Sequence, residues 1–169
     1  MAKVFEKMSL NYASHLSALI KAVLATDGDV LELGMGFFST PVLHHLCILG
    51  KRKLVSYDNI DKYVIWARYY GYEGKYHKIH YVDNWDKAKI EKPWDVVLVD
   101  HSPNERRIIE IRRLAKYAKY IVIHDAERKK DREYHYSEIY PLFKYKSIWE
   151  EDRTAVLSNF VDLTDFKKK

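Results

Sequence analysis

The stretch "VLELGMGFFSTP", residues 30–41, decides how the rest of the chain is interpreted. Its first residues are mostly apolar, as in a short strand buried within a parallel sheet. Gly34 and Gly36 follow in a turn, after which Thr40 and Pro41 provide a helix N-cap and a first helical residue. The stretch therefore predicts a strand, a glycine turn and a helix, with backbone N–H groups and the helix N-terminus facing a ligand.

The remainder of the chain alternates between strand-like and helix-like segments. Apolar residues at helical spacing predict an amphipathic helix within residues 1–25, with Tyr12 on its buried stripe. Further strands are expected within residues 53–59, 78–85, 94–103 and 119–127, separated by helices near 61–71 and 104–117. A short helix near 134–140 and a hairpin within 143–160, turning at Glu150–Arg153, follow. The sequence thus predicts an α/β fold with a mostly parallel seven-stranded sheet, helices on both faces and an antiparallel C-terminal hairpin.

The composition indicates a single domain spanning residues 1–169. The chain is 47% hydrophobic, which is enough for one core, and residues 163–169 are expected to form a frayed basic tail. No apolar run is long enough to cross a membrane and no secretory signal is visible, so we expect a cytoplasmic protein without a membrane partner. The single cysteine, Cys47, excludes an internal disulfide.

The net charge of +5 permits nucleic-acid binding without requiring it. Acidic residues interrupt the basic clusters, which is typical of solvated surfaces. The fourteen tyrosines could stack on bases, although packing is their commoner use. A short chain with many aromatic residues on its surface is also compatible with a homodimer.

The order Glu32-Leu-Gly34-Met-Gly36 resembles the first motif of class I methyltransferases, a Rossmann-like family that uses S-adenosylmethionine. The resemblance extends over roughly residues 15–160 through the order of elements and the acids at strand ends. It implies that the glycine loop accommodates the methionine part of the cofactor and that Glu32 supports the loop or binds the cofactor's amino group. Phe38 stands where the family often has a third glycine, so the amino-acid end of the pocket is expected to be reshaped.

Polar residues after the second and third predicted strands extend the cofactor site. Asp58 ends the second strand, where a carboxylate can accept both hydrogen bonds of a ribose diol, and Asn59 follows it. By the same resemblance, Asp83 or Asn84 would read the adenine amino group and Trp85 would cover the ring. Asp58 as a helix cap and Trp85 as a core residue are the structural alternatives. The expected cofactor residues are therefore Glu32, Gly34, Gly36, Asp58, Asn59, Asp83, Asn84 and Trp85.

The methyl acceptor is expected beyond the carboxyl ends of the fourth and fifth strands, where open parallel sheets bind ligands. Asp100 and His101 follow one strand, and His124 and Asp125 follow the other. If these strands are neighbours the four side chains lie together, and a neutral imidazole oriented by a carboxylate can take a proton from the acceptor. We predict these four residues as catalytic, with Arg106 as an anion clamp on the substrate.

No metal ion is expected, with one weaker alternative. The segments "VDHSPNERR" and "IVIHDAE" partly resemble catechol O-methyltransferase-like branches, in which acids at these strand ends bind magnesium. Asp100 and Asp125 match those acids. Ala126 and Pro103 stand where those branches have an asparagine ligand and a catalytic lysine, so two carboxylates would hold magnesium only loosely.

The sequence thus predicts a minimal S-adenosylmethionine-dependent methyltransferase. The motif that grips exocyclic amines of bases is missing after the fourth strand, as is the cysteine motif for carbon-5 methylation of cytosine, which leaves an oxygen acceptor of unspecified identity. One alternative is a nicotinamide-dependent oxidoreductase, which Glu32 and the C-terminal hairpin disfavour. Another is a non-enzymatic module that binds nucleic acid or a protein partner through its basic clusters.

Overall fold

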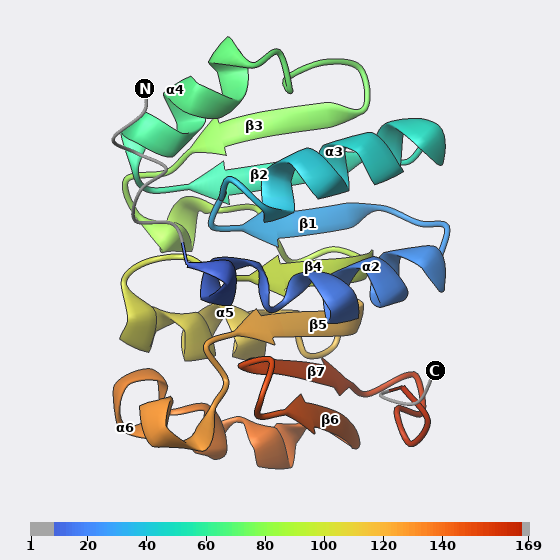
Figure 1. Ribbon diagram of the computed structural model, residues 1–169, viewed down its shortest axis with the longest axis vertical. Helices are drawn as coiled ribbons and strands as arrows, with labels where there is room; N and C mark the ends of the chain where they lie inside the picture. Colours follow the sequence, from blue (N-terminus) through green and yellow to red (C-terminus); the bar gives the residue numbers. More distant parts are fainter. Residues whose placement is uncertain (1–8, 167–169) are drawn as a thin grey trace.

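Seven strands form one sheet in the computed structural model, which describes residues 9–166 (Figure 1). They are β1 (Val30–Leu33), β2 (Leu54–Asp58), β3 (His77–Tyr81), β4 (Trp94–Val99), β5 (Ala118–His124), β6 (Tyr145–Trp149) and β7 (Thr154–Ser158). The strand order is β3-β2-β1-β4-β5-β7-β6. The first five strands pair in parallel, whereas β7 runs antiparallel between β5 and β6. This arrangement confirms the predicted sheet and its C-terminal hairpin.

Helices connect the strands and cover both faces of the sheet. The α-helices are α2 (Leu16–Leu24), α3 (Ser39–Leu49), α4 (Asp61–Tyr69), α5 (Arg107–Leu114) and α6 (Asp131–Tyr134). Short 3-10 turns are η1 (Leu10–Ala13), η2 (Trp85–Lys87), η3 (Asn104–Arg106), η4 (Arg128–Lys130), η5 (Tyr136–Glu138) and η6 (Tyr140–Leu142). In Figure 1, α2 and α3 lie in front of the sheet and α5 lies behind it. Among residues 9–166, no helix combines the length and the apolar character needed to cross a lipid bilayer.

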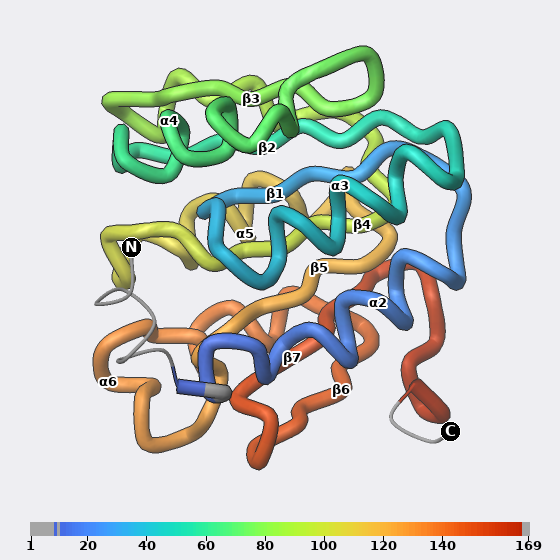
Figure 2. The backbone as a smooth tube through the Cα atoms, turned by 45° about the horizontal axis from the view of Figure 1, so that its top comes forward, coloured from blue at the N-terminus to red at the C-terminus, as the bar shows by residue number. Residues whose placement is uncertain are grey.

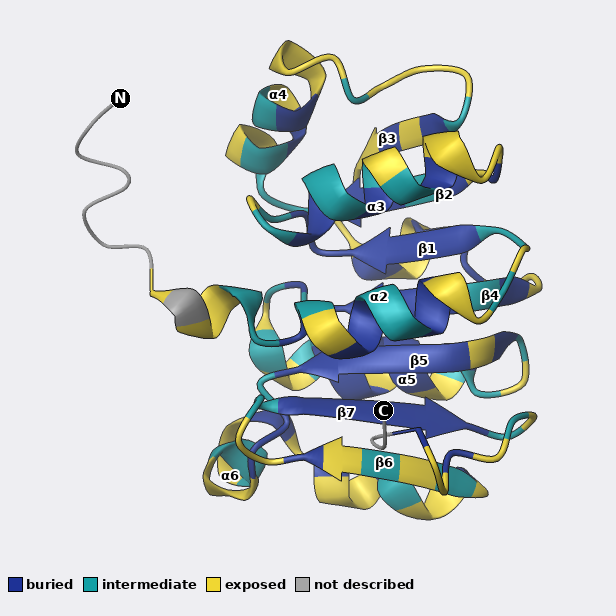
Figure 3. Ribbon diagram, turned by 45° about the vertical axis from the view of Figure 1, so that its right-hand side comes forward, coloured by how far each residue is buried: buried dark blue, intermediate teal, exposed yellow. Residues whose placement is uncertain are grey.

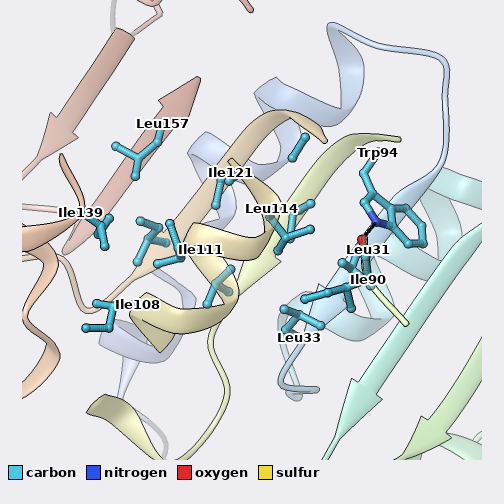
Figure 4. Close-up of a cluster of buried hydrophobic side chains, with 14 of the residues drawn as sticks. Leu31, Leu33, Ile90, Trp94, Ile108, Ile111, Leu114, Ile121, Ile139 and Leu157 are labelled. Carbon is cyan, nitrogen blue, oxygen red and sulfur yellow. Dashed lines mark hydrogen bonds between the residues drawn. The ribbon is translucent and has the colours of Figure 1, made fainter. Parts of the chain in front are cut away.

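Two layers of apolar side chains hold the helices against the sheet. Because strands of a parallel sheet are buried on both faces, β1, β4 and β5 are almost continuously apolar. One layer joins these strands to α2 and α3. The other layer packs Leu33 and Ile121 against Ile111 and Leu114 of α5 (Figure 4). Trp94 closes the far end of this layer and donates its indole N–H to the Ile90 carbonyl at 2.8 Å.

Burial falls off toward the two edges of the sheet (Figure 3). The interior strand β1 is buried at every position, whereas the edge strand β6 alternates between exposed and covered residues. The other edge strand, β3, also exposes about every second side chain. Lys78 and Lys146 are exposed on these short edge strands, which discourages pairing with another chain.

The chain before the sheet differs from the predicted helix over residues 1–25. Residues 1–8 lie outside the described part, the η1 turn comes next, and α2 begins only at Leu16. Tyr12 is 60% exposed rather than on a buried stripe. The apolar spacing was correct within α2, but Ser9 caps the 3-10 turn by accepting from the Asn11 N–H, so the backbone takes a separate turn there.

Three further boundaries need correction. The helix α3 begins at Ser39 after Phe38, so Thr40 lies in its first turn and is not the N-cap. The helix predicted near 134–140 is instead α6 followed by two 3-10 turns. The expected frayed tail is ordered as far as it is described, because Leu163 and Phe166 are buried in the layer under α2.

Candidate functional site

The carboxyl ends of β1 to β5 meet at one edge of the sheet, on the left in Figure 1. The loop after β1 crosses this edge and begins with Gly34, whose φ is +93°. A Cβ atom on Gly34 would lie 2.5 Å from the backbone of Asp100 and of His101. No residue with a side chain fits there, because backbone atoms cannot move aside. The first glycine of the motif is therefore required by the packing of the protein itself.

The second glycine of the motif has a different environment. Gly36 has no positive φ, and a Cβ on it would meet only the Ser39 hydroxyl, at an ordinary 3.5 Å. Nothing in the described chain forbids a side chain at this position. Gly36 lines the cavity described below, so its missing side chain leaves room for a ligand to approach the backbone.

The N–H groups of this loop already have acceptors within the protein. The Gly34 N–H donates to the Tyr57 carbonyl at 2.9 Å, and the Met35 N–H donates to Asp58 Oδ2 at 2.7 Å. The Gly36 N–H donates to the Thr40 hydroxyl at 3.0 Å. The loop is therefore held rigidly, and these three successive N–H groups are not available to cradle an anion.

Asp58 stands at the end of β2 and lines the cavity, although it is only 3% exposed. Its second oxygen, Oδ1, accepts from the Ile60 N–H at 2.8 Å. The Asn59 backbone also donates to this carboxylate, whose two oxygens together accept about four hydrogen bonds, so one acceptor site remains for a ligand. Burial raises the pKa of Asp58 to about 6, although the backbone hydrogen bonds oppose this shift. Asp58 thus holds the turn after β2 and faces the cavity, but it does not cap α4, whose N-cap is Ile60 without a side-chain hydrogen bond.

Glu32 lies beneath the loop and does not line the cavity. It is fully buried, and it accepts hydrogen bonds from the hydroxyls of Ser39 at 2.7 Å, Thr40 at 2.9 Å and Ser56 at 2.6 Å. Burial raises its pKa to about 7 against the effect of these three hydroxyls. Because Thr40 also holds the Gly36 N–H, Glu32 supports the loop from below, and it makes no contact with the space where a cofactor's amino group would lie.

A cavity of about 390 Å³ opens between the glycine loop, the ends of β2, β4 and β5, and the start of α5. This volume lies in the range of sites for small organic ligands. Phe37 and Phe38 line the cavity without filling it. The Phe37 ring packs edge-on against Trp66 of α4, with ring centroids 4.7 Å apart. The bulky residue at the third glycine position therefore leaves the cavity open.

The residues expected around the adenine do not line the cavity. Asp83 is exposed and forms an ion pair with Lys87 at 2.8 Å. Asn84 caps η2 by accepting from the Asp86 N–H at 2.9 Å. Trp85 is buried against the His101 ring, with centroids 4.0 Å apart, so its core alternative describes its place. The η2 turn directs these residues away from the cavity, and Asn59 also lies outside it.

The acids and histidines after β4 and β5 do come together, because these strands are neighbours. Asp100 Oδ2 lies 3.2 Å from His124 Nδ1, and Asp125 Oδ2 lies 3.9 Å from the same nitrogen. All three residues line the cavity. Burial alone would raise the pKa of Asp100, but the adjacent Arg107 guanidinium and His124 lower it to about 2. Asp100 is therefore a permanent carboxylate at the cavity wall.

His101 also lines the cavity, but its ring is engaged elsewhere. The ring stacks on Trp85, and Nε2 lies 3.3 Å from the buried Glu110 of α5. Burial would raise the pKa of Glu110, but hydrogen bonds from His101 and Arg106 lower it. His101 thus ties the loop after β4 to α5, and its position does not support the predicted proton transfer.

The arginine at the cavity is Arg107 and not the predicted Arg106. Arg106 lies outside the cavity and pairs with Asp86 and with Glu110. The Arg107 side chain is buried, and it contacts Asp100 at 2.9 Å and Asp125 at 3.5 Å. Helical spacing could have revealed this, since positions 107, 111 and 114 share the face of α5 that faces the core.

His124 differs from the predicted free base because both of its nitrogens face acceptors. Nδ1 faces the Asp100 carboxylate, and Nε2 lies 3.2 Å from the Asn11 carbonyl. The Ser14 hydroxyl, 3.1 Å from Nε2, already donates its proton to the same carbonyl. The pKa of His124 is raised by Asp100 in spite of burial. An imidazolium satisfies both contacts, so His124 acts as a charged partner of Asp100.

His15 at the cavity was not expected from the sequence. Its ring is 2% exposed, and neither ring nitrogen has a hydrogen-bond partner among the described residues. Burial lowers its pKa to about 4, so the imidazole is neutral near pH 7. The sequence could not show this, because a continuous helix over residues 1–25 gave no reason to bring His15 to the sheet edge.

Solved structures with a similar fold include three methyltransferases. The delta-N METTL16 methyltransferase domain has a TM-score of 0.60 at 11% identity, covering 90% of this chain and 83% of that domain. Human methyltransferase-like protein 13, solved in complex with S-adenosylhomocysteine (SAH), has a TM-score of 0.53 at 17% identity, covering 85% and 77%. The 16S rRNA methylase ArmA has a TM-score of 0.51 at 13% identity, covering 89% and 86%.

These likenesses establish the fold, which is that of class I methyltransferases. A comparison with protein-family models finds no match, and neither does a comparison with curated proteins.

Proposed function

We propose that this chain, which has the class I methyltransferase fold, transfers a methyl group from S-adenosylmethionine to an oxygen acceptor. The observation that carries the proposal is the cavity at the carboxyl edge of the sheet. It joins the open position beside Gly36 to the buried carboxylate of Asp58. Cofactors of open α/β sheets bind at this edge.

The residues of the cavity fit this cofactor. Asp58 would accept hydrogen bonds from the ribose, and the open face of Gly36 would receive the amino-acid part. The bound cofactor supplies an electrophilic methyl group on a cationic sulfonium. The Asp58 and Asp100 carboxylates favour such a cation in the partly buried cavity. The SAH bound to human methyltransferase-like protein 13 supports the same choice.

The nicotinamide alternative is disfavoured by the hydrogen bonds of the glycine loop. A dinucleotide places its pyrophosphate against free N–H groups at this turn. In this chain the N–H groups of Gly34, Met35 and Gly36 are taken up by Tyr57, Asp58 and Thr40. The loop therefore favours a cationic ligand over a dianionic one.

The acceptor end of the cavity supports an oxygen nucleophile. An alcohol or phenol must lose its proton as it attacks, so its binding site needs proton-accepting or metal-binding groups. Asp100, His124, Asp125 and His15 line this end of the cavity. His15 is the member whose nitrogens have no partner among the described residues.

Thermal melts of the purified chain test the proposal. The chain is melted alone and with SAH, NAD⁺ or a single-stranded oligonucleotide, each over a range of concentrations. We expect SAH to stabilise the chain by about 2.7 kcal/mol at 100 times its dissociation constant. A shift with NAD⁺ alone would support the oxidoreductase, and a salt-sensitive shift with the oligonucleotide alone would support a nucleic-acid-binding module.

Transfer itself is measured with S-adenosylmethionine labelled on its methyl group, against panels of small phenols, sugars and peptides. Alkaline stability of the labelled products distinguishes ethers from methyl esters. Products labelled only on nitrogen or carbon would contradict the oxygen acceptor while leaving the cofactor assignment intact.

A further inference from the structure

We propose that His15, Asp100 and His124 bind one divalent transition-metal ion at the acceptor end of the cavity. This set differs from the pair Asp100 and Asp125 that the sequence alone suggested. The site stands independently of methyl transfer, because metal binding alone tests it.

The three side chains converge from distant parts of the sequence. His15 precedes α2, Asp100 follows β4, and His124 ends β5. One potential ligand atom from each lies within 4.8 Å of the other two. Figure 2 shows the blue segment before α2 beside the orange chain after β5. The rings of His15 and His124 lie next to each other, with centroids 4.6 Å apart.

His15 supplies the first argument for an ion. Its ring is buried, its centroid lies 4.6 Å from that of His124, and both of its nitrogens are without a partner among the described residues. Leaving a buried polar group unsatisfied costs about 1–3 kcal/mol, and such groups are rare in folded proteins. A metal ion would give one of these two nitrogens the partner that it lacks among the described residues.

His124 has the orientation of a metal ligand. Its Nε2 faces the Asn11 carbonyl at 3.2 Å, which is the kind of outer contact that fixes a ligating imidazole. Its Nδ1 lies 3.2 Å from Asp100 Oδ2, a separation suited to two ligands of one ion. With Zn–N and Zn–O bonds of about 2.0–2.2 Å, an ion would take the place of the proton between them.

The local charges permit an added cation. Arg107 pairs with Asp100 through Oδ1 and leaves Oδ2 for the ion. Arg153 contacts the carboxylates of both Asp125 and Glu127. Within the described part of the chain, these three residues are the remaining charged groups near the site. Three carboxylates thus face two guanidinium groups, which leaves one net negative charge before the histidines are counted.

The ligand chemistry selects the class of ion. Two imidazoles with one carboxylate suit Zn²⁺ or a related transition metal, whereas Mg²⁺ prefers oxygen ligands. Three protein ligands leave a coordination position open, as in catalytic zinc sites. Because all three residues line the cavity, the open position would face the space where an acceptor oxygen binds.

Metal binding to the full chain, free of any affinity tag and stripped with a chelator, tests this site. Zn²⁺ is titrated by calorimetry into wild type, His15→Gln and His44→Ala. His44 is the matched control, because it lies 3.2 Å from His77 in a second histidine pair away from the cavity. We expect one Zn²⁺ per chain, an affinity at least about 30-fold lower in His15→Gln, and no change in His44→Ala. Circular dichroism establishes that both variants are folded.

The proposal is overturned if wild type binds no Zn²⁺, if His15→Gln binds as tightly as wild type, or if His44→Ala alone loses binding. If His15→Gln does not fold, the position of the ion is read from wild-type crystals soaked in Zn²⁺. We expect an anomalous peak within bonding distance of His15, Asp100 and His124, and a peak only elsewhere contradicts the site.

Discussion

At the scale of single residues, the two glycines of the β1 loop have separate functions. Gly34 is required because its Cβ would overlap the backbone after β4, whereas Gly36 has open space where a side chain would be. The sequence motif presents them as a pair. The structure shows that folding requires Gly34, and we propose that Gly36 leaves room for the ligand.

Alanine substitutions at the two glycines should therefore affect different properties, namely stability at Gly34 and SAH binding at Gly36. Gly34→Ala should destabilise the fold by more than about 2 kcal/mol, because it adds an overlap to an unfavourable positive φ. Gly36→Ala should change stability by less than about 0.5 kcal/mol but weaken SAH binding. Urea unfolding and SAH titration measure the two effects. Equal loss of stability in both variants would contradict the division.

Substitutions of two acids from the predicted cofactor site should also differ in their effect on SAH binding. Asp58→Asn removes a charged acceptor from the cavity and should weaken SAH binding by about 10- to 100-fold, since a hydrogen bond to a charged group contributes about 1.5–3 kcal/mol. Asp83→Asn alters an exposed ion pair outside the cavity and should leave the affinity unchanged. Calorimetric titration with SAH measures the affinity of each variant. The reverse order of effects would restore the original sequence prediction for Asp83.

Glu32 should make stability depend on pH. Its native pKa of about 7 exceeds the ordinary value of 4.5, so between these values the folded chain holds a proton that the unfolded chain has released. Stability should therefore fall as pH rises through this window, by up to about 3 kcal/mol. Glu32→Gln imitates the protonated form and lacks this loss.

Urea unfolding of wild type and Glu32→Gln at pH 5 and pH 8 measures this effect, with the exposed Glu151→Gln as control. The advantage of Glu32→Gln over wild type should grow with pH, and Glu151→Gln should follow wild type. A pH-independent difference between Glu32→Gln and wild type would show that Glu32 is ionised in the folded chain throughout.

At the scale of elements, α5 carries charged side chains into the core. Arg107 lies on its buried face beside Asp100 and Asp125, whereas Arg112 is half exposed and pairs with the exposed Glu138. Arg107→Met leaves two carboxylates with less compensation and should cost about 3–5 kcal/mol. Arg112→Met should cost less than about 1 kcal/mol. Urea unfolding compares them, and similar costs would mean that Asp100 and Asp125 do not depend on Arg107.

The strands were predictable because most of the parallel strands are apolar runs that are followed by polar residues or glycine. Their order in the sheet was not predicted from the sequence. The β6–β7 hairpin was predictable from its polar turn at Glu150–Arg153. Asp58, Asp100, His124 and Asp125 reach the cavity because strand ends meet at one edge of the sheet. The positions of other residues, around the cavity and in the core, could not be predicted from these patterns. Hydrogen bonds and long-range packing determine where the η2 turn directs Trp85, how η1 brings His15 to the sheet, and why Phe166 is buried.

At the scale of the whole molecule, the side chains that stabilise the fold and the cavity that would bind a ligand lie in different parts of the sheet. Apolar layers cover both faces of the sheet, and the cavity lies at the carboxyl ends of the strands, between the loops that follow β1, β2, β4 and β5. The loop N–H groups are already satisfied there and carboxylates line the wall, which favours a cationic nucleoside over a dinucleotide.

A crystal structure of the chain grown with SAH tests this account most directly. We predict electron density for SAH inside the cavity, with the ribose hydroxyls against Asp58 and the amino-acid part beside Gly36. Density for the nucleoside outside this cavity, or a cavity closed by Phe37 and Phe38 with SAH absent, would contradict the account.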